Sequence, residues 1–298
     1  MAHTYRANIG DRARMILSRN AELCVIAVHS ESVYARCNDG RLLLICPDKY
    51  GCVPFGIALS EYADFREKHI FSVGDALKIS DGKLVLSGKQ EIFFEDTGVA
   101  AFKRTTHALS SGDAVLYCAK YVRENASTRG IGPALPAFLC IGTPRGESNA
   151  YALSAAGEAD RFEFAFTTGD AAALDRTVGR FVGLGYGLTP SGDDFLCGMM
   201  YALHRYARIS DRANSYLRML STSVRAHIGA TNEVSAEYIR CALDGEYFEV
   251  VERMLDCLSN EQNDTASLDA ALGGLLAVGA SSGSDILCGM LFAVYLLW

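Results

Sequence analysis

The sequence has no excess of basic residues. Its 28 lysines and arginines are outnumbered by 35 aspartates and glutamates, which gives a formal net charge of −7 at neutral pH. A nucleic-acid-binding surface needs clustered lysine and arginine to neutralise phosphates, and no stretch of this sequence interleaves basic with aromatic residues. Nucleic acid is therefore not the expected partner.

The sequence also lacks a long apolar run. Its apolar end, Ile286–Trp298, has only 13 residues, whereas a helix that crosses a bilayer needs roughly 20. The first residues, Met1–Arg6, lack the apolar core of a signal peptide. The ten cysteines are scattered, with no Cys-x-x-Cys pair, and several lie in apolar runs where cysteine acts as a small hydrophobic residue. We therefore expect a protein of the reducing cytoplasm, without a membrane partner.

Several common catalytic motifs are absent. The sequence contains no Gly-x-Ser-x-Gly, the turn that exposes the nucleophilic serine of many hydrolases. Its glycine-rich segment is not followed by Gly-Lys-Ser or Gly-Lys-Thr, as a P-loop would be, and it lacks the glycine spacing of a dinucleotide-binding fold. An ATPase or a dehydrogenase is therefore not expected, and no nucleophile stands out.

What is present is the composition of a globular protein, with 50% hydrophobic and 21% charged residues. In the first hundred residues, short apolar runs alternate with tight-turn signals such as Asn38-Asp39-Gly40 and Ser80-Asp81-Gly82. Closely spaced short strands predict an antiparallel β barrel or sandwich over residues 1–100. A short helix is expected at Ala13–Leu17, and the expected strands are Leu23–His29, Ser32–Cys37, Arg41–Cys46, Phe55–Leu59, Ala76–Ile79, Lys83–Leu86 and Ile92–Glu95.

Beyond about residue 100, the strand pattern gives way to alanine-rich segments with helical periodicity. Residues 101–298 are therefore predicted to form a mainly helical domain, which makes the chain an α+β protein. The segment Gly130–Pro136 interrupts the helices and is predicted to be a hinge between the two halves of the chain. The expected helices include Ala114–Arg123, Ala171–Val182, Arg212–Ala230 and Phe248–Leu258.

The second half is organised around residues 183–198, Gly-Leu-Gly-Tyr-Gly-Leu-Thr-Pro-Ser-Gly-Asp-Asp-Phe-Leu-Cys-Gly. Alternating glycines such as Gly185 and Gly187 reach backbone conformations that a β-carbon forbids, and they leave room for a ligand near the main chain. Thr189 or Ser191 can cap a following helix, whose free N–H groups attract an anion. The segment predicts a loop, a cap and a buried helix.

Asp193 and Asp194 lie in the first turn of this expected helix. Two carboxylates repel a bare phosphate, unless a Mg²⁺ ion lies between them or the ligand carries amide N–H donors beside its anionic group. The expected ligand is therefore a small anionic or amide-bearing molecule, and no cofactor other than Mg²⁺ is indicated. The alternative is that both acids merely complement the helix dipole.

A second copy of this motif lies within residues 279–290. The segment Ser282–Met290 matches Ser191–Met199, and both copies run into an apolar helix, with Asp285 in the place of Asp194. Two such helix starts predict a pair of helices around one cleft. A duplication that serves packing alone is the alternative.

The two copies differ at one acidic position, where Ser284 replaces Asp193. A repeat that serves only packing has no evident need for this asymmetry, whereas an asymmetric ligand does. The small residues Gly198 and Gly289 occupy matching positions one turn after the motif. We expect the paired helices to meet through these two glycines.

The segment Gly185–Asp194 resembles the signature of a bacterial family long labelled as having unknown function, whose best-described member is the AllH-type subunit of oxamate carbamoyltransferase. Residues 279–285 are similar to that family's second motif, and Thr231–Ser235 is similar to the segment between the two motifs. A weaker similarity extends to Gly51–Gly56. The sequence departs from the family at Tyr186, where proline is more usual.

This resemblance implies a subunit of a carbamoyltransferase that works with other subunits in anaerobic allantoin breakdown, moving a carbamoyl group between the nitrogen of oxamate and phosphate. We expect Asp193, Asp194 and Asp285 to be catalytic. The residues expected to bind substrate, some through main-chain N–H groups, are Gly185, Gly187, Thr189, Ser191, Gly192, Asn232, Ser235, Ser282 and Gly283. Capping of the next helix explains Asn232 equally well. A non-catalytic binding or scaffold subunit, and an enzyme for another small carbamoyl compound, remain alternatives.

Overall fold

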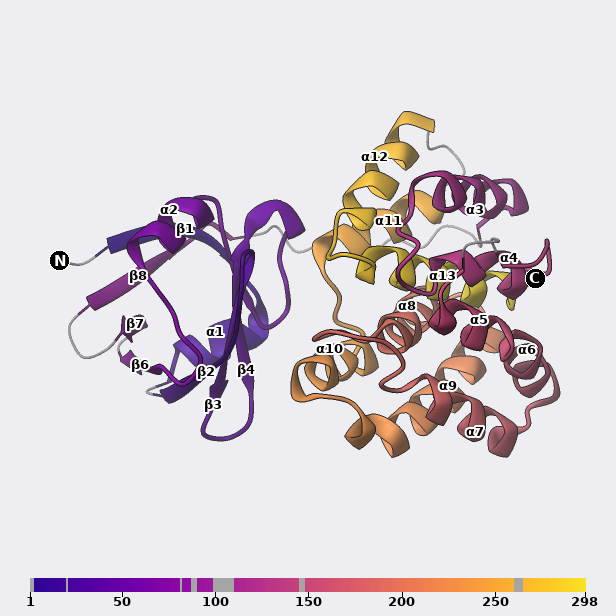
Figure 1. Ribbon diagram of the computed structural model, residues 1–298, viewed down its shortest axis with the longest axis horizontal. Helices are drawn as coiled ribbons and strands as arrows, with labels where there is room; N and C mark the ends of the chain where they lie inside the picture. The colour runs from indigo at the N-terminus through magenta and orange to yellow at the C-terminus, as the bar shows by residue number, and fades with distance from the viewer. Residues whose placement is uncertain are drawn as a thin grey trace. The chain divides into compact units, whose positions relative to one another are not determined.

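The computed structural model describes residues 3–19, 21–80, 82–86, 90–98, 110–144, 148–259 and 265–298. The chain divides into two compact units, one of residues 1–103 with 247–249 and one of residues 104–246 with 250–298. Figure 1 draws the first unit in indigo and purple, and most of the second from magenta to yellow. The described part of the first unit is a β barrel, and that of the second is helical.

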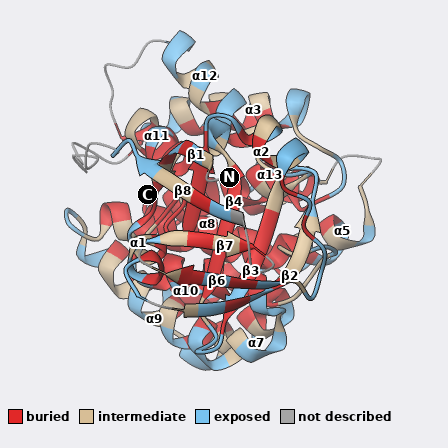
Figure 2. Ribbon diagram, turned by 90° about the vertical axis from the view of Figure 1, so that its left-hand side faces the viewer, coloured by how far each residue is buried: buried red, intermediate tan, exposed pale blue. Residues whose placement is uncertain are grey.

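In the described part of the first unit, eight strands form a closed barrel in the order β1-β5-β4-β3-β2-β6-β7-β8. Side chains alternate between the two faces of a strand, so that Tyr5, Ala7 and Ile9 of the first strand are buried in the core; Figure 2 shows buried residues along the strands of the barrel. The strands are β1 (His3–Ile9), β2 (Ala21–His29), β3 (Ser32–Cys37), β4 (Leu42–Pro47), β5 (Gly56–Leu59), β6 (Ala76–Ser80), β7 (Lys83–Leu86) and β8 (Gln90–Asp96).

All seven expected strands are found, but the expected antiparallel arrangement is wrong at two pairings. Strand β1 pairs in parallel with β8, and β4 pairs in parallel with β5. Strand direction depends on partners distant in sequence, which a local pattern does not specify. The turn at Asn38-Asp39-Gly40 is confirmed, because Gly40 has a φ of 85° and its N–H donates to Cys37 O. Asp81 of the second predicted turn lies outside the described residues.

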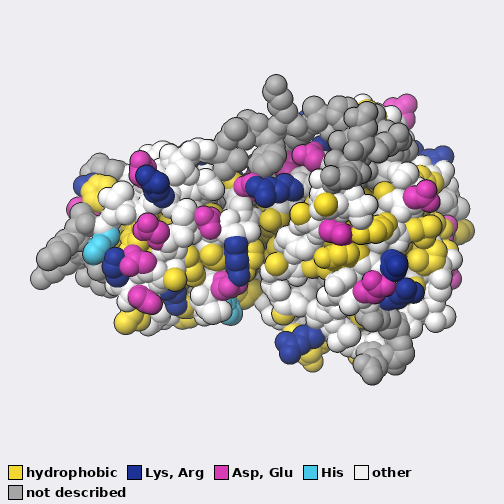
Figure 3. All heavy atoms as spheres, turned by 90° about the horizontal axis from the view of Figure 1, so that it is seen from above, with side chains coloured by type: hydrophobic (Ala, Val, Ile, Leu, Met, Phe, Trp, Pro, Cys, Tyr) yellow, Lys and Arg dark blue, Asp and Glu magenta, His cyan; other side chains and the backbone are white. Residues whose placement is uncertain are grey.

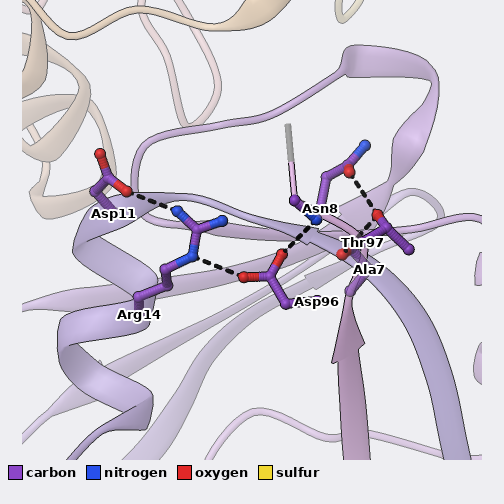
Figure 4. Close-up of polar contacts among 7 residues, drawn as sticks. Ala7, Asn8, Asp11, Arg14, Asp96 and Thr97 are labelled. Carbon is purple, nitrogen blue, oxygen red and sulfur yellow. Dashed lines mark hydrogen bonds and ion pairs between the residues drawn. The ribbon is translucent and has the colours of Figure 1, made fainter. Parts of the chain in front are cut away.

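Polar contacts tie the end of β8 to the start of the chain (Figure 4). Arg14, on helix α1 (Asp11–Leu17), donates from Nε to Asp96 Oδ2 and from Nη1 to Asp11 Oδ1, at 2.7 Å each. Thr97 Oγ1 bonds the main-chain oxygen of Ala7 at 3.1 Å. The guanidinium of Arg14 lowers the pKa of Asp96. These contacts join α1 and β1 to β8, where the parallel pairing closes the barrel.

The second unit is built around helix α8. This helix packs against α7, α9, α10 and α13, and the phenylalanine rings of its surroundings form a continuous cluster. All four helices expected above are found. The helices are α3 (Gly112–Asn125), η2 (Gly132–Ala134), α4 (Leu135–Phe138), α5 (Ala150–Ala156), α6 (Ala159–Thr168), α7 (Ala171–Phe181), α8 (Ser191–Tyr206), α9 (Asp211–His227), η3 (Ile228–Ala230), α10 (Glu233–Leu243), α11 (Glu249–Leu258), α12 (Thr265–Leu276) and α13 (Ser282–Tyr295); the first unit also holds η1 (Asp48–Tyr50) and α2 (Tyr62–Lys68).

The predicted hinge at Gly130–Pro136 is wrong. This segment lies within the helical unit, contains η2 and the start of α4, and is mostly buried. Gly130 allows close packing, since a β-carbon there would lie 2.2 Å from Asp285 Oδ1.

The described surface has no dominant charge on the face seen in Figure 3. There, acidic and basic side chains of the helical unit lie in small groups among hydrophobic ones. In the described part of the chain, no helix is long and apolar enough to cross a membrane. All ten cysteines lie in this part, and no disulfide joins any two of them.

Candidate functional site

Helix α8 begins differently from the sequence prediction. Its N-cap is Pro190, whose carbonyl accepts the N–H groups of Asp193 and Asp194 at 2.9 and 3.1 Å. Ser191 is the first helical residue, so its predicted capping role is wrong. Thr189 is not the cap either, because its hydroxyl lies 2.9 Å from Ser282 Oγ. That hydroxyl pair joins the start of α8 to the start of α13.

The glycines of the loop before α8 have two different roles. Gly183, Gly185 and Gly187 all have positive φ, at 79°, 126° and 93°. At Gly185, however, a β-carbon would lie 2.6 Å from Ser191 N, so this glycine permits the loop to pack on its own helix. At Gly187 nothing lies within 4 Å of that position among the described residues. Of these two predicted ligand-binding glycines, only Gly187 leaves open space.

Gly192 and Gly283, also expected to bind substrate, occupy equivalent packing positions. A β-carbon at Gly192 would lie 2.1 Å from Phe181 O, and one at Gly283 would lie 1.8 Å from Leu275 O. Each glycine is the second residue of its helix and lets the preceding helix pass close to it. Their missing side chains are explained by this packing.

Asp193 connects the loop to helix α10. Its Oδ1 accepts the Gly183 N–H at 2.8 Å, and its Oδ2 accepts the hydroxyls of Thr231 and Ser235 at 2.5 and 2.6 Å. Burial raises the pKa of Asp193, whereas these three hydrogen bonds lower it. Because both of its carboxylate oxygens accept hydrogen bonds, the Asp193 side chain holds the loop in place.

Asn232 and Ser235 lie at the start of α10, the helix to which Asp193 connects the loop. Asn232 is the N-cap of α10, and its Oδ1 accepts the N–H groups of Val234 and Ser235 at 3.1 and 3.0 Å. Ser235 is 1% exposed and gives its hydroxyl to Asp193. The capping alternative for Asn232 is therefore confirmed, and the Ser235 hydroxyl is taken up by Asp193.

Helices α8 and α13 cross in direct main-chain contact. A β-carbon at Gly198 would lie 2.0 Å from Ile286 O, and one at Gly289 would lie 1.9 Å from Phe195 O. The expected meeting through these two glycines is confirmed. Because each glycine contacts the residue that follows the motif aspartate of the other helix, both helix starts lie on the same side of the crossing.

The crossing places Asp194 and Asp285 in the interior, near enough for the charge of Asp285 to act on Asp194. Asp194 is 5% exposed and Asp285 is fully buried. Burial, followed by the charge of Asp285, raises the pKa of Asp194 well above its ordinary value, against hydrogen bonds from Ser282 and Thr189. Burial raises the pKa of Asp285 to about 7, against hydrogen bonds that include those from Ser191 and the Ile131 N–H. Neither Asp194 Oδ2 nor Asp285 Oδ2 has a hydrogen-bond partner among the described residues.

A third element of the site was missed by the sequence prediction. The N–H of Ile131 donates to Asp285 Oδ1 at 2.5 Å, and Gly130 packs against both oxygens of the same carboxyl. Asn149, the N-cap of α5, holds this segment by donating from Nδ2 to the carbonyls of Thr128 and Gly130. The glycines of this segment were a signal of close packing, but nothing in the sequence pointed to Asp285 as the neighbour.

The side-chain groups that hydrogen-bond the two carboxyl groups are hydroxyls. Among the described residues, no group of three or more His, Cys, Asp or Glu side chains is placed to hold a metal ion. The two carboxyl groups are accompanied by the hydroxyls of Thr189, Ser191 and Ser282. Oxygen donors of this kind suit Mg²⁺, and equally the N–H groups of an amide. Burial raises the pKa of both carboxyl groups, and the charge of Asp285 raises that of Asp194 further, so this interior disfavours two ionised carboxylates.

Comparison with known proteins supports the family expected from the motifs. Residues 181–294, which include the loop and both aspartates of the pair, match the family model described as oxamate carbamoyltransferase subunit AllH. The resemblance to the AllH-type subunit is thereby confirmed over this segment. No solved structure matches the chain closely enough to be significant.

Proposed function

Taking as premise that residues 181–294 are an AllH-type segment, we propose that this chain is one subunit of a carbamoyltransferase acting on oxamate and carbamoyl phosphate in allantoin nitrogen breakdown. The family description supports an involvement with oxamate carbamoyltransferase and the presence of other subunits. The substrate, the pathway, the cytoplasmic location and the catalytic role belong to the proposal.

The observation that carries the proposal is the pair of unpartnered oxygens, Asp194 Oδ2 and Asp285 Oδ2, buried inside the matching segment. A buried acceptor without a donor is costly, so such atoms are rare unless a ligand or a proton supplies the missing partner. Oxamate and the carbamoyl group both carry amide N–H donors. We therefore assign the pair to the amide nitrogen of the substrate.

The transfer itself requires proton movement. When the amide nitrogen of oxamate attacks the carbonyl carbon of carbamoyl phosphate, a C–N bond forms, the C–O bond to phosphate breaks, and the nitrogen loses a proton. The ionised member of the Asp194–Asp285 pair is the proposed acceptor of that proton. In the reverse direction, the protonated member returns it to the leaving nitrogen. The raised pKa values of both groups suit a pair that works near neutral pH.

The other predicted site residues take supporting roles in this proposal. Asp193 positions the loop through Gly183, so it is a positioning residue rather than the proton acceptor. Main-chain N–H groups near Gly187 are proposed to hold the anionic end of the substrate, since that part of the loop has open space. The motif repeat is proposed to be a duplication that supplies one buried aspartate from each of two helices.

The test is carbamoyl transfer by the assembled complex, with the full-length chain carrying Asp194→Asn or Asp285→Asn. We expect each variant to lower the transfer rate by roughly a hundredfold or more, the usual loss when a general base is removed. Asp211→Asn is the matched control, because Asp211 is also a first-turn acid but is exposed on α9. Its activity is expected to equal that of the wild type.

The alternative, a non-catalytic scaffold subunit, gives a different result. In that case Asp194→Asn and Asp285→Asn complexes that assemble normally, as judged by size-exclusion chromatography, retain full activity. That outcome would overturn the catalytic assignment while leaving the family membership of the segment untouched.

A further inference from the structure

A pocket lies in the helical unit, built by α6, α9 and the end of α13. Its volume is about 380 Å³, which falls within the range of small-molecule sites. The side chains that carry the argument are Glu163, Thr167, Arg212, Tyr216, Tyr295 and Trp298. This pocket shares no residue with the aspartate pair.

Aromatic rings form the walls of this pocket and are held in place by their own contacts. The rings of Tyr295 and Trp298 meet at 75° with centroids 6.3 Å apart, so they form a corner. Trp298 Nε1 donates to Ser110 O at 3.1 Å, although half of the side chain is exposed. Tyr216 packs on Phe166 with centroids 4.9 Å apart. A corner of fixed rings with an open face suits stacking of a flat ring.

Charged groups of both signs complete the pocket. Arg212 donates from Nη1 to Leu297 O at 3.3 Å, and no carboxylate of the described residues lies within ion-pair distance of its guanidinium. Glu163 accepts the Tyr295 hydroxyl at 3.3 Å and the Cys140 thiol at 3.7 Å, neither of which neutralises its charge. Arg212 is therefore available to an anionic group, and Glu163 to an N–H donor.

We propose that this pocket binds a flat, nitrogen-bearing ring that carries one anionic group, with a nucleoside monophosphate as the representative ligand. The ring stacks in the corner of Tyr295 and Trp298, its N–H groups donate to Glu163, and its phosphate binds Arg212. The ligand is one with a single anionic group, because one arginine faces the pocket. This binding site is independent of the proposed carbamoyl transfer.

The single tryptophan of the chain reports on this pocket directly. We expect adenosine monophosphate to change the fluorescence of Trp298 in the full-length protein in a saturable way. Adenosine, which lacks the anion, and ribose 5-phosphate, which lacks the ring, are each expected to bind at least roughly tenfold more weakly. Equilibrium dialysis with adenosine monophosphate gives a second measurement that does not depend on fluorescence.

The variant Arg212→Gln is expected to weaken binding of adenosine monophosphate by roughly tenfold or more. Arg218→Gln is the matched control, since Arg218 is exposed on the same helix and does not line the pocket. The proposal is overturned if adenosine monophosphate binds in neither measurement. It is equally overturned if Arg212→Gln binds as the wild type does, or if adenosine or ribose 5-phosphate binds as tightly as the nucleotide.

Discussion

At the scale of single residues, two adjacent aspartates have different surroundings. Successive residues of a helix point about 100° apart, so Asp193 faces the glycine loop and α10 while Asp194 faces α13. Asp193 has both oxygens satisfied, whereas Asp194 has one without a partner among the described residues. The sequence alone assigned both the same role, because adjacency in sequence says nothing about which neighbour each side chain meets.

The buried pair predicts how stability depends on pH. The pKa of Asp285 in the folded chain is about 7, above its ordinary value in the unfolded chain. The folded state therefore binds more protons between these two values, and the free energy of unfolding falls as pH rises through this window, by up to about 1.4 kcal/mol per pH unit. Urea unfolding at a series of pH values from 5 to 8 measures this fall.

Asp285→Asn is expected to flatten that dependence. An amide keeps the acceptor for the Ile131 N–H but cannot ionise, so the variant lacks the group whose titration produces the fall. The variant should be at least as stable as the wild type at pH 8, while the exposed control Asp211→Asn should leave the wild-type curve unchanged. If stability instead rises between pH 5 and 8, and does so equally in the wild type, Asp285→Asn and Asp211→Asn, the raised pKa of Asp285 is contradicted.

Much of this site was predictable from sequence, because the motif occurs twice. The matching positions of Asp194 and Asp285, and of Gly198 and Gly289, indicated two helices that meet through one face. The contact of Ile131 with Asp285 was not predictable, since it joins residues 154 positions apart and neither segment carries a signal for the other. The glycines of the loop were interpreted as leaving space for a ligand. Several of them instead allow main-chain atoms to pack closely.

At the scale of elements, the crossing of α8 and α13 decides the geometry of the site. Gly198→Ala would place a methyl group 2.0 Å from Ile286 O, a main-chain atom that cannot move without shifting its helix. We expect the variant to lower the free energy of unfolding by about 1–3 kcal/mol, the typical cost of overpacking a core. Urea unfolding followed by Trp298 fluorescence measures this loss.

Gly274→Ala is the matched control for this helix substitution. Gly274 lies within α12, and nothing is within 4 Å of its added β-carbon among the described residues. Alanine favours helix over glycine by about 0.5–1 kcal/mol. The control is therefore expected to be slightly stabilised, and equal effects of the two substitutions would show that the helices do not pack as described.

The strands were predictable where the sequence alternates and ends in a turn. Ser32–Cys37 and Lys83–Leu86 were predicted with the bounds that the structure has. Strand β1 was missed, although Tyr5, Ala7 and Ile9 alternate with polar residues, because it has only three apolar side chains and its main partner, β8, lies far along the chain. Local alternation identifies strands, but closure of the barrel depends on pairings between its two ends.

At the scale of the whole molecule, each of the two units has a core of its own. The barrel core includes Leu43, which is fully buried. Leu43→Ala is expected to destabilise the barrel by about 2–5 kcal/mol. Labelling of the buried thiols of Cys37 and Cys46 in increasing urea measures barrel opening, while Trp298 fluorescence follows the helical unit.

In that experiment, the thiols of Leu43→Ala should become reactive at lower urea than those of the wild type, with the Trp298 midpoint unchanged. Equal shifts of both midpoints would mean that the two units unfold as one cooperative body. Leu116→Ala is the control, because Leu116 is half exposed on α3 and its truncation should change neither midpoint appreciably.

The contact between α8 and α13 also limits how this chain can change over generations. A side chain that clashes with another side chain can be rescued by a smaller neighbour, but Gly198 and Gly289 each face a carbonyl oxygen that every amino acid carries. A selection for second-site suppressors of Gly198→Ala should therefore yield true revertants rather than compensating substitutions at Ile286. Each glycine is constrained by the main chain of the other helix, so neither can be replaced without moving that helix.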